Sequence, residues 1–233
     1  MKSKSVFKSW MVFALAVSIC GFGFAGLAAA EEETPAKAGE KVGVEGTFVR
    51  VAENSEGWVV VGYRAANGAV GKEWVFFDIG MTVQRGVKDQ KITRDDVKFV
   101  TGKGEVINMA TQEEYSKAAG SLAAMEREAL MMRDSIDYFP PGADQACRIG
   151  FFTDQSQPMR GMAYDEVELS PNRACLGRVY FQVPGGLQLG NYNLDVKFAD
   201  SIVKVPVEIM TKEQAKEFEK KWKEAEKEAK HKK

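Results

Sequence analysis

The sequence predicts a mainly β protein, an antiparallel two-sheet sandwich with one inserted α-helix and a C-terminal helix. Short segments in which apolar and polar residues alternate recur between residues 45 and 210, with turn sequences between them. This alternation is typical of strands with one buried face. Two windows, residues 111–137 and 211–233, instead repeat apolar residues every three or four positions, as amphipathic helices do. About seven or eight short strands separated by turn signals favour a sandwich of two sheets.

The chain begins with a segment typical of an export signal. A lysine-rich start is followed by a stretch without charge from Trp10 to Ala30, which ends in three alanines before three glutamates. We therefore expect residues 1–30 to be a signal peptide, cleaved near Ala30, and the protein to be periplasmic or secreted. Two alternatives stay open, an uncleaved membrane anchor and a lipoprotein junction at Cys20.

The charge of the remaining chain argues against a nucleic-acid partner. Without residues 1–30, 29 basic and 33 acidic residues remain, a net charge of −4, whereas nucleic-acid binding calls for a basic face. We expect no membrane contact after signal cleavage. Residues 31–44 are charged and contain proline and glycine, so we interpret them as a linker before a single domain over residues 45–210.

The first part of the domain contains several segments with the pattern of strands. Residues 58–63 are apolar on both faces and should lie in the middle of a sheet. Residues 74–83 alternate more clearly, with Asp78, Gly80 and Thr82 on the face opposite the apolar stripe, and should form a long half-buried strand. Shorter segments of this kind are residues 47–51, 97–99 and 106–107.

A helix is expected to interrupt the strands. Thr111 and Glu114 have the spacing of a capping box, in which each side chain hydrogen-bonds to the free backbone amide of the other residue. Apolar residues then follow at alternating intervals of three and four as far as Ile136. We expect this helical insertion to span residues 111–137 and to end before Pro140.

Alternation returns after the helix. Strands are expected near residues 147–151, 167–169, 175–183, 192–198 and 203–209. Pro206 lacks an amide hydrogen for a ladder, so the last of these should be an edge strand or carry a bulge.

Two cysteines remain once Cys20 leaves with the signal peptide. In an exported chain Cys147 and Cys175 are expected to form a disulfide. Both fall on apolar strand faces, so the bond should join two strands through the core. Closing a loop of about 29 residues would stabilise the fold by roughly 3–4 kcal/mol. The alternatives are a reactive thiol, which needs a base, and a metal thiolate, which needs further ligands; the one histidine is His231, in the charged tail.

A resemblance rests on three stretches, "GWVVVGYRAANGAVGKEWVFFDIGMTV", "DDVKFVTGKGEV" and "CLGRVYFQVPGGLQLGNYNLDVKF". Together they resemble the secreted bacterial immunoglobulin-like, telokin-like domains of unknown function, over residues 45–110 and 164–209. The resemblance implies export and an immunoglobulin-like sandwich, and it supplies no catalytic residues. The helix at 111–137 and the segment through Cys147 depart from the pattern and are interpreted as an insertion.

The C-terminal segment, residues 211–233, begins with a second capping box at Thr211 and continues with an apolar stripe among lysines and glutamates. Phe218 and Trp222 lie one turn apart on this stripe. Two interpretations stay open. Either this charged helix covers the two aromatic side chains by packing on the sandwich, or Phe218 and Trp222 bind a protein partner.

The sequence contains no complete catalytic constellation. The body lacks histidine, which excludes Ser–His–Asp and Cys–His arrangements there. Asp165, Glu166 and Glu168 include paired carboxylates of the kind used in glycoside hydrolysis, but we interpret them as a solvated flank. Met159 and Met162 suggest thioether ligation of copper(I), although methionine more often fills apolar gaps.

We therefore expect no enzyme, no cofactor and no metal. The function that these observations favour is an exported, non-catalytic β-sandwich module that binds a protein or a surface polymer of the cell envelope. The alternative is an exported protein that handles a small ligand or copper(I) through the methionine-containing loop at residues 154–163. The sequence does not indicate an oligomeric state.

Overall fold

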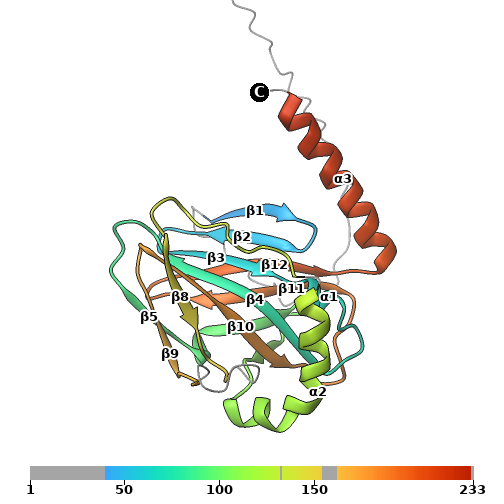
Figure 1. The fold of residues 1–233 in the computed structure, drawn as a ribbon, viewed down its shortest axis with the longest axis horizontal. Helices are drawn as coiled ribbons and strands as arrows, with labels where there is room; N and C mark the ends of the chain where they lie inside the picture. Colours follow the sequence, from blue (N-terminus) through green and yellow to red (C-terminus); the bar gives the residue numbers. More distant parts are fainter. Residues whose placement is uncertain (1–39, 132, 154–161, 232–233) are drawn as a thin grey trace, which may run out of the picture. The chain divides into compact units, whose positions relative to one another are not determined.

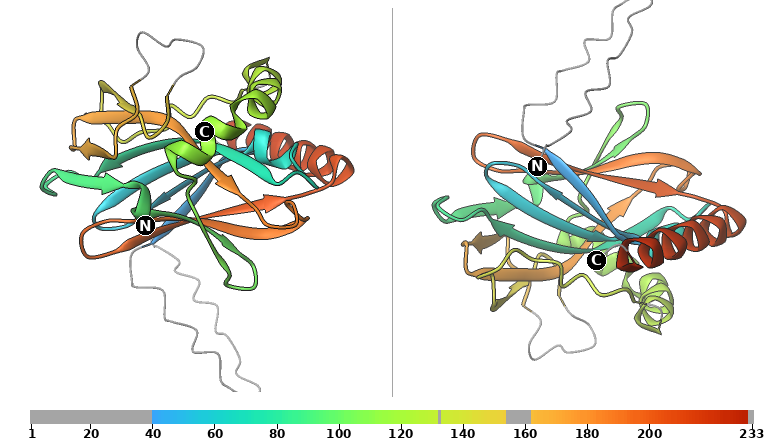
Figure 2. Two further views of the ribbon diagram at one scale, coloured as in Figure 1. Left: turned by 90° about the horizontal axis from the view of Figure 1, so that it is seen from below. Right: turned by 90° about the horizontal axis from the view of Figure 1, so that it is seen from above.

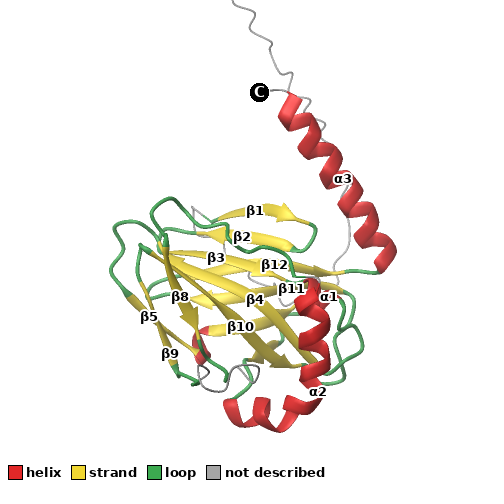
Figure 3. Cartoon of the chain, in the orientation of Figure 1, coloured by secondary structure: helices red, strands yellow, loops and turns green. Residues whose placement is uncertain are grey.

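The computed structural model describes residues 40–131, 133–153 and 162–231, and there the chain is mainly β, with three sheets and three α-helices (Figures 1 and 3). The signal peptide predicted for residues 1–30 and most of the methionine-containing loop lie outside the described residues. None of the helices in the described part is both long enough and apolar enough to cross a bilayer.

The largest sheet has six strands in the order β1-β2-β3-β4-β10-β8. Their bounds are Lys41–Gly46 for β1, Val49–Glu53 for β2, Gly57–Gly62 for β3, Trp74–Val83 for β4, Arg173–Gln182 for β10 and Gln145–Ile149 for β8. All neighbours are antiparallel except β8 and β10, which run parallel. The expectation of purely antiparallel pairing was therefore wrong at this edge, and so was the linker assignment for residues 41–44, which belong to β1.

The second sheet has four strands in the order β12-β11-β6-β7, and a two-stranded sheet pairs β5 with β9. The bounds are Ile202–Ile209 for β12, Gly190–Lys197 for β11, Val97–Thr101 for β6, Val106–Asn108 for β7, Gln90–Thr93 for β5 and Glu166–Leu169 for β9. A 3-10 turn, η1 (Arg94–Asp96), connects β5 to β6. Pro206 does lie in an edge strand, since β12 pairs only with β11.

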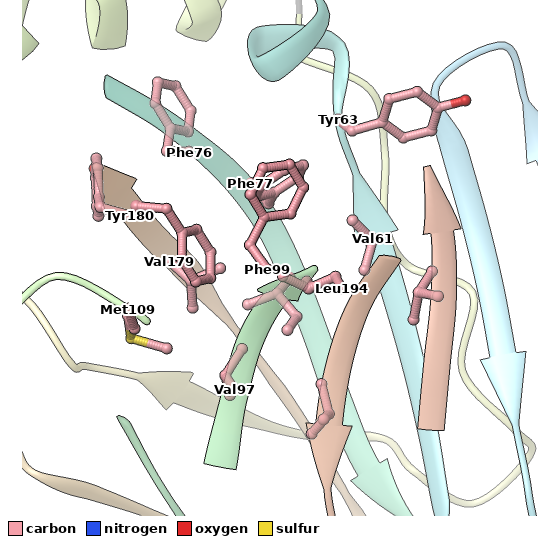
Figure 4. Close-up of a cluster of buried hydrophobic side chains, with 14 of the residues drawn as sticks. Val61, Tyr63, Phe76, Phe77, Val97, Phe99, Met109, Val179, Tyr180 and Leu194 are labelled. Atoms are coloured by element: carbon pink, nitrogen blue, oxygen red, sulfur yellow. The ribbon is translucent and has the colours of Figure 1, made fainter. Parts of the chain in front are cut away.

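The hydrophobic core lies between the six-stranded and the four-stranded sheets. Phe77 on β4 lies against Phe99 on β6, with ring centres 5.0 Å apart (Figure 4). The ring of Phe181 on β10 lies 5.6 Å from that of Phe99. All three side chains are fully buried. Burying a large apolar side chain contributes about 1.5–3 kcal/mol, so aromatic contacts of this kind hold the two sheets together.

The outer face of the six-stranded sheet is also covered. Helix α2 (Gln112–Met131) lies over β4 and β10, and the segment that follows it crosses β2, β3 and β4 (Figures 1 and 2). Phe139 of that segment comes so close to Gly80 that a Cβ there would lie 2.7 Å from the ring. The strand at residues 74–83 is therefore buried on both faces, not half-buried as its alternation predicted.

The inserted helix ends earlier than expected. The helical spacing predicted a helix as far as Ile136, but α2 ends at Met131 and residues 133–140 have no regular structure. Ile136 is still 2% exposed, because it packs on Val49, Val51 and Val60 on the outer face of the sheet. The sheet therefore buries this apolar side chain, although Ile136 is not part of a helix.

Two further helices complete the fold. The short α1 (Arg64–Asn67) follows β3, and α3 (Lys212–His231) follows β12. The backbone amide of Thr111 donates to the Glu114 carboxylate at 2.7 Å, and that of Thr211 donates to the Gln214 side chain at 2.9 Å, so both capping boxes predicted for α2 and α3 are present. The hydrogen bonds from the backbone amide and hydroxyl of Thr111 lower the pKa of Glu114, as expected for a carboxylate stabilised in its charged form.

Candidate binding site

A groove with a volume of about 730 Å³ lies between α2 and the outer face of β4, β10 and β8. Its volume is within the range of small-molecule binding sites, roughly 300–1,000 Å³. Its described lining comprises four arginines, two carboxylates, three aromatic residues and several apolar side chains. The polar and aromatic members are Asp78, Tyr115, Glu126, Arg127, Arg133, Arg148, Phe152, Thr153, Arg178 and Tyr180. We call this site the arginine groove.

Helix α2 supplies one wall of the arginine groove. Ala123, Glu126, Arg127 and Leu130 line it, and their spacing of three and four residues places them along one side of the helix. The apolar residues Leu122 and Met125 are buried and fix the helix on the sheet. Burial of this neighbouring stripe therefore determines which polar side chains face the groove.

Strand β10 supplies the floor through residues on its outer face. Arg178 donates from Nε to Oδ1 of Asp78 at 3.0 Å, and Nε of Arg133 lies 3.6 Å from the same oxygen. Asp78 sits directly opposite Arg178 in the β4–β10 register, and its side chain is only 10% exposed. Burial alone would lower the pKa of Arg178, but the Asp78 carboxylate outweighs it and the pKa is raised.

Two tyrosines bind the second carboxylate of the arginine groove. The hydroxyl of Tyr180 donates to Oε1 of Glu126 at 2.5 Å. The hydroxyl of Tyr115 shares its proton between the same oxygen and the carbonyl oxygen of Thr153, each at 3.3 Å. Burial, reinforced by the charge of Glu126, raises the pKa of Tyr180 far above its usual range. Tyr180 therefore keeps its proton and acts on Glu126 only as a donor.

Strand β8 forms the far wall, and the disulfide attaches it. Cys147 lies directly opposite Cys175 in the parallel ladder, and the two are bonded with Cα atoms 4.1 Å apart. The pairing is the one that the sequence predicts. The bond does not cross the core between two sheets, however, since it joins neighbouring strands of one sheet. It thereby places Arg148, the residue after Cys147, at the edge of the arginine groove.

The backbones of β8 and β10 approach closely beside the disulfide. Gly177 pairs with Ile149, and a Cβ at Gly177 would overlap the Ile149 carbonyl oxygen and lie 2.6 Å from the Ile149 Cβ. Glycine is needed at position 177 because the neighbouring strand leaves no room for a side chain, and not because of the backbone angles there. The last residues of β8 are thus held against β10 at the point where both line the groove.

The described lining of the arginine groove carries more positive than negative charge, although the chain does not. Among these described residues four guanidinium groups face two carboxylates, whereas the whole chain has a net charge of −1. Arg127 is exposed on α2 and forms no ion pair within the described part of the chain. Guanidinium groups bind carboxylates and phosphates through paired hydrogen bonds. The arrangement can therefore hold an acidic group.

The residues singled out in the sequence lie elsewhere. Phe218 and Trp222 on α3 are half-buried, and the guanidinium of Arg50 lies 5.2 Å from the centre of the Phe218 ring. Glu166 and Glu168 are exposed and paired with lysine and arginine, as a solvated flank would be. Met162 is 71% exposed, and Met159 lies outside the described residues. Among the described residues, no group of three or more histidine, cysteine, aspartate or glutamate side chains could hold a metal ion.

Sequence reasoning did not find the arginine groove. Alternation does place Arg178 on the polar face of its strand, and helical spacing puts Glu126 beside the apolar stripe of α2. Neither pattern shows that α2 lies over that strand, because this contact joins residues about 50 positions apart. The parallel return of β8, which adds Arg148, is not visible in either pattern.

No family model matches the chain, and no curated protein or solved structure matches it either. The chemistry of the arginine groove is accordingly inferred from its own geometry.

Proposed function

We propose that this chain is an exported, non-catalytic binding module of the cell envelope, and that its arginine groove holds the acidic groups of its ligand. The observation that carries the proposal is the excess of guanidinium groups in a groove of ligand size on a chain of slightly negative net charge. Export is proposed from the amino-terminal sequence, and binding from the groove.

The four arginines have different roles in this proposal. Arg133 and Arg178 both face Oδ1 of Asp78, so their charge is partly compensated. Arg127 and Arg148 are exposed on the two walls, α2 and β8. An incoming acid would meet these two first, and a partly desolvated groove strengthens their attraction.

Binding is a better account of the groove than catalysis. Asp78 accepts from an arginine, and Glu126 accepts from two tyrosine hydroxyls. Both carboxylates are thus held by hydrogen-bond donors of the protein itself. A fixed set of donors and acceptors of this kind is suited to ligand recognition.

The proposal is tested by titrating the exported protein with polyglutamate and with polyphosphate, which present the two kinds of acidic group, and with polylysine for comparison. We expect an acidic polymer to bind with an affinity that falls as salt is added. The double variant Arg127→Gln/Arg148→Gln should weaken that binding at least tenfold. The matched control is Arg85→Gln/Lys88→Gln, which removes two exposed positive charges from the loop between β4 and β5.

Equal effects of the two double variants would show that only net charge matters and would overturn the site. If polyglutamate, polyphosphate and an acidic polysaccharide all fail to bind, the proposed function itself is overturned. Arg127→Gln alone serves as a further check, because this exposed side chain forms no ion pair among the described residues and its loss should not disturb folding.

We also propose that the two larger sheets form an immunoglobulin-like sandwich, similar to the telokin-like domains. Support comes from the aromatic core between the sheets and from the antiparallel pairs β3–β4, β4–β10 and β11–β12. Amino-terminal sequencing of exported protein tests the proposed localisation. We expect the mature chain to begin at Glu31, and an intact Met1 in the membrane fraction would contradict cleavage.

A further inference from the structure

The hydrogen-bonding pattern of the arginine groove restricts its ligand further, given that the proposed function holds. Both tyrosine hydroxyls donate to Oε1 of Glu126. Among the described residues, Oε2 of Glu126 receives no such bond. An ionised carboxylate only accepts, so a ligand group at Oε2 has to be a donor.

The charge of the groove determines which kind of donor fits. An ammonium group would be repelled, because four guanidinium groups outnumber two carboxylates among the described residues that line the groove. A neutral donor avoids this repulsion, which leaves a hydroxyl or an amide N–H. The acidic part of the ligand faces the arginines, so the ligand combines an acid with a neutral donor.

The neighbourhood of Glu126 favours the hydroxyl. Arg127 follows it on the same helix, and Arg178 lies beside Tyr180 on the facing strand, so guanidinium donors line the same groove as the free carboxylate oxygen. A hydroxyl donates one hydrogen bond and accepts others at the same atom. An amide N–H only donates, and its carbonyl points away in the trans peptide. A hydroxyl therefore satisfies both Glu126 and a neighbouring arginine.

We infer that the ligand of the arginine groove is an acidic sugar, a uronate unit of a polysaccharide. Its carboxylate binds Arg127 and Arg148, and a ring hydroxyl donates to Oε2 of Glu126. The wall of α2 from Ala123 to Leu130 is about 10 Å long at 1.5 Å per residue, which suits a short stretch of such a chain. An acidic peptide is the competing ligand.

The test compares three probes on the exported protein: an oligogalacturonate, an oligoglutamate with the same number of carboxylates, and a neutral oligogalactose. We expect the oligogalacturonate to bind at least tenfold more tightly than either of the others. Arg127→Gln/Arg148→Gln should abolish this binding.

Glu126→Gln separates the two kinds of ligand. It removes a negative charge from the groove. The affinity for a ligand held by charge alone, such as oligoglutamate, should therefore rise about twofold to fivefold. The same variant replaces the charged acceptor by a neutral one, which makes a weaker hydrogen bond. The affinity for oligogalacturonate should therefore fall about threefold to tenfold. Glu128→Gln, an equal charge change on the same helix outside the lining of the arginine groove, should strengthen both slightly.

The outcomes distinguish the two levels of inference. Oligoglutamate could bind as tightly as oligogalacturonate, with Glu126→Gln raising both affinities and the double arginine variant lowering both. This result would overturn the inference of an acidic sugar and leave the proposed function standing. Binding of neither acidic probe overturns both.

Discussion

The guanidinium of Arg50 lies between two aromatic rings, 5.2 Å from the centre of Phe218 on α3 and 5.2 Å from that of Tyr63. Arg50 is only 7% exposed, and its Nη1 donates to the carbonyl oxygens of Gly46 and Val49 at 2.9 Å. This side chain thus connects β2 to the first turns of α3. A cation over an aromatic ring contributes about 0.5–2 kcal/mol, depending on its desolvation.

Phe218→Ala should therefore destabilise the protein by about 1–2 kcal/mol, since it removes the ring contact and part of the apolar burial. Thermal and urea unfolding measure the change. Trp222→Ala, one turn further along α3, is the matched comparison and should cost less, because no described cation lies over its ring. Equal stability of Phe218→Ala and the unaltered protein would contradict the contact.

Deleting residues 211–233 should lower the thermal stability and leave the oligomeric state unchanged. The reason is that Ala215 packs on the core and Phe218 contacts Arg50, so the start of α3 belongs to the domain. Light scattering and a thermal melt check the two halves of this prediction. If stability stays the same while self-association or capture of a partner is lost, then α3 is an interaction element.

Arg178→Met should destabilise the protein by roughly 2–4 kcal/mol. The reason is that the buried carboxylate of Asp78 then keeps only the more distant Arg133 as an ion-pair partner among the described residues. The side chains of Arg178 and Asp78 are 20% and 10% exposed, so solvent screens them little. Asp78→Asn combined with Arg178→Met should cost less than the sum of the single changes. Urea unfolding of the four proteins gives the coupling, and strict additivity would show that the pair is not energetically linked.

Thiol titration of the denatured, unreduced protein should find no free thiol from Cys147 and Cys175. Replacing both by serine should destabilise the protein by about 3–4 kcal/mol in the chain-entropy description, for a sequence separation of 28 residues. Two reactive thiols per chain would contradict the bond.

Asp195→Asn should raise the melting temperature at pH 7. Burial raises the pKa of Asp195 above its usual value and outweighs the attraction of Lys204, and within the described chain Oδ1 is buried without a hydrogen-bond partner. A carboxyl whose pKa is higher in the folded state destabilises it once ionised, fully above the folded pKa and not at all well below the unfolded pKa.

The gain from Asp195→Asn should therefore shrink as the pH falls from 7 through the raised pKa toward 3.8, the ordinary value. Thermal melts at several pH values check this course. A gain from Asp195→Asn that does not depend on pH would show that charge is not its cause.

Strand alternation and helical spacing predicted most elements because both patterns report which side chains a segment buries. The long strand near residues 175–183 and the two capping boxes were found in this way. The predicted helix end at Ile136 was wrong for the same reason. This residue continued the helical stripe, yet it is buried on the sheet, and spacing alone cannot tell one apolar neighbour from another.

The arginine groove could not be predicted because it depends on contacts between distant segments. Glu126 and Tyr180 are 54 residues apart, and Arg148 reaches the groove only through the parallel pairing of β8 with β10. Parallel neighbours need a long connection, so no local turn sequence indicates them. The cysteines were the one local signal that these two strands meet.

The close approach of Gly177 and Ile149 gives this chain a recognisable signature. In register, Cys147-Arg148-Ile149 lies beside Cys175-Leu176-Gly177, with cysteine facing cysteine and a bulky residue facing glycine. Any larger residue at position 177 would push the strands apart next to the bond that joins them. Distant descendants of the same ancestor are therefore expected to keep the two triplets as a unit, and a search for that paired pattern would find them where overall similarity has faded.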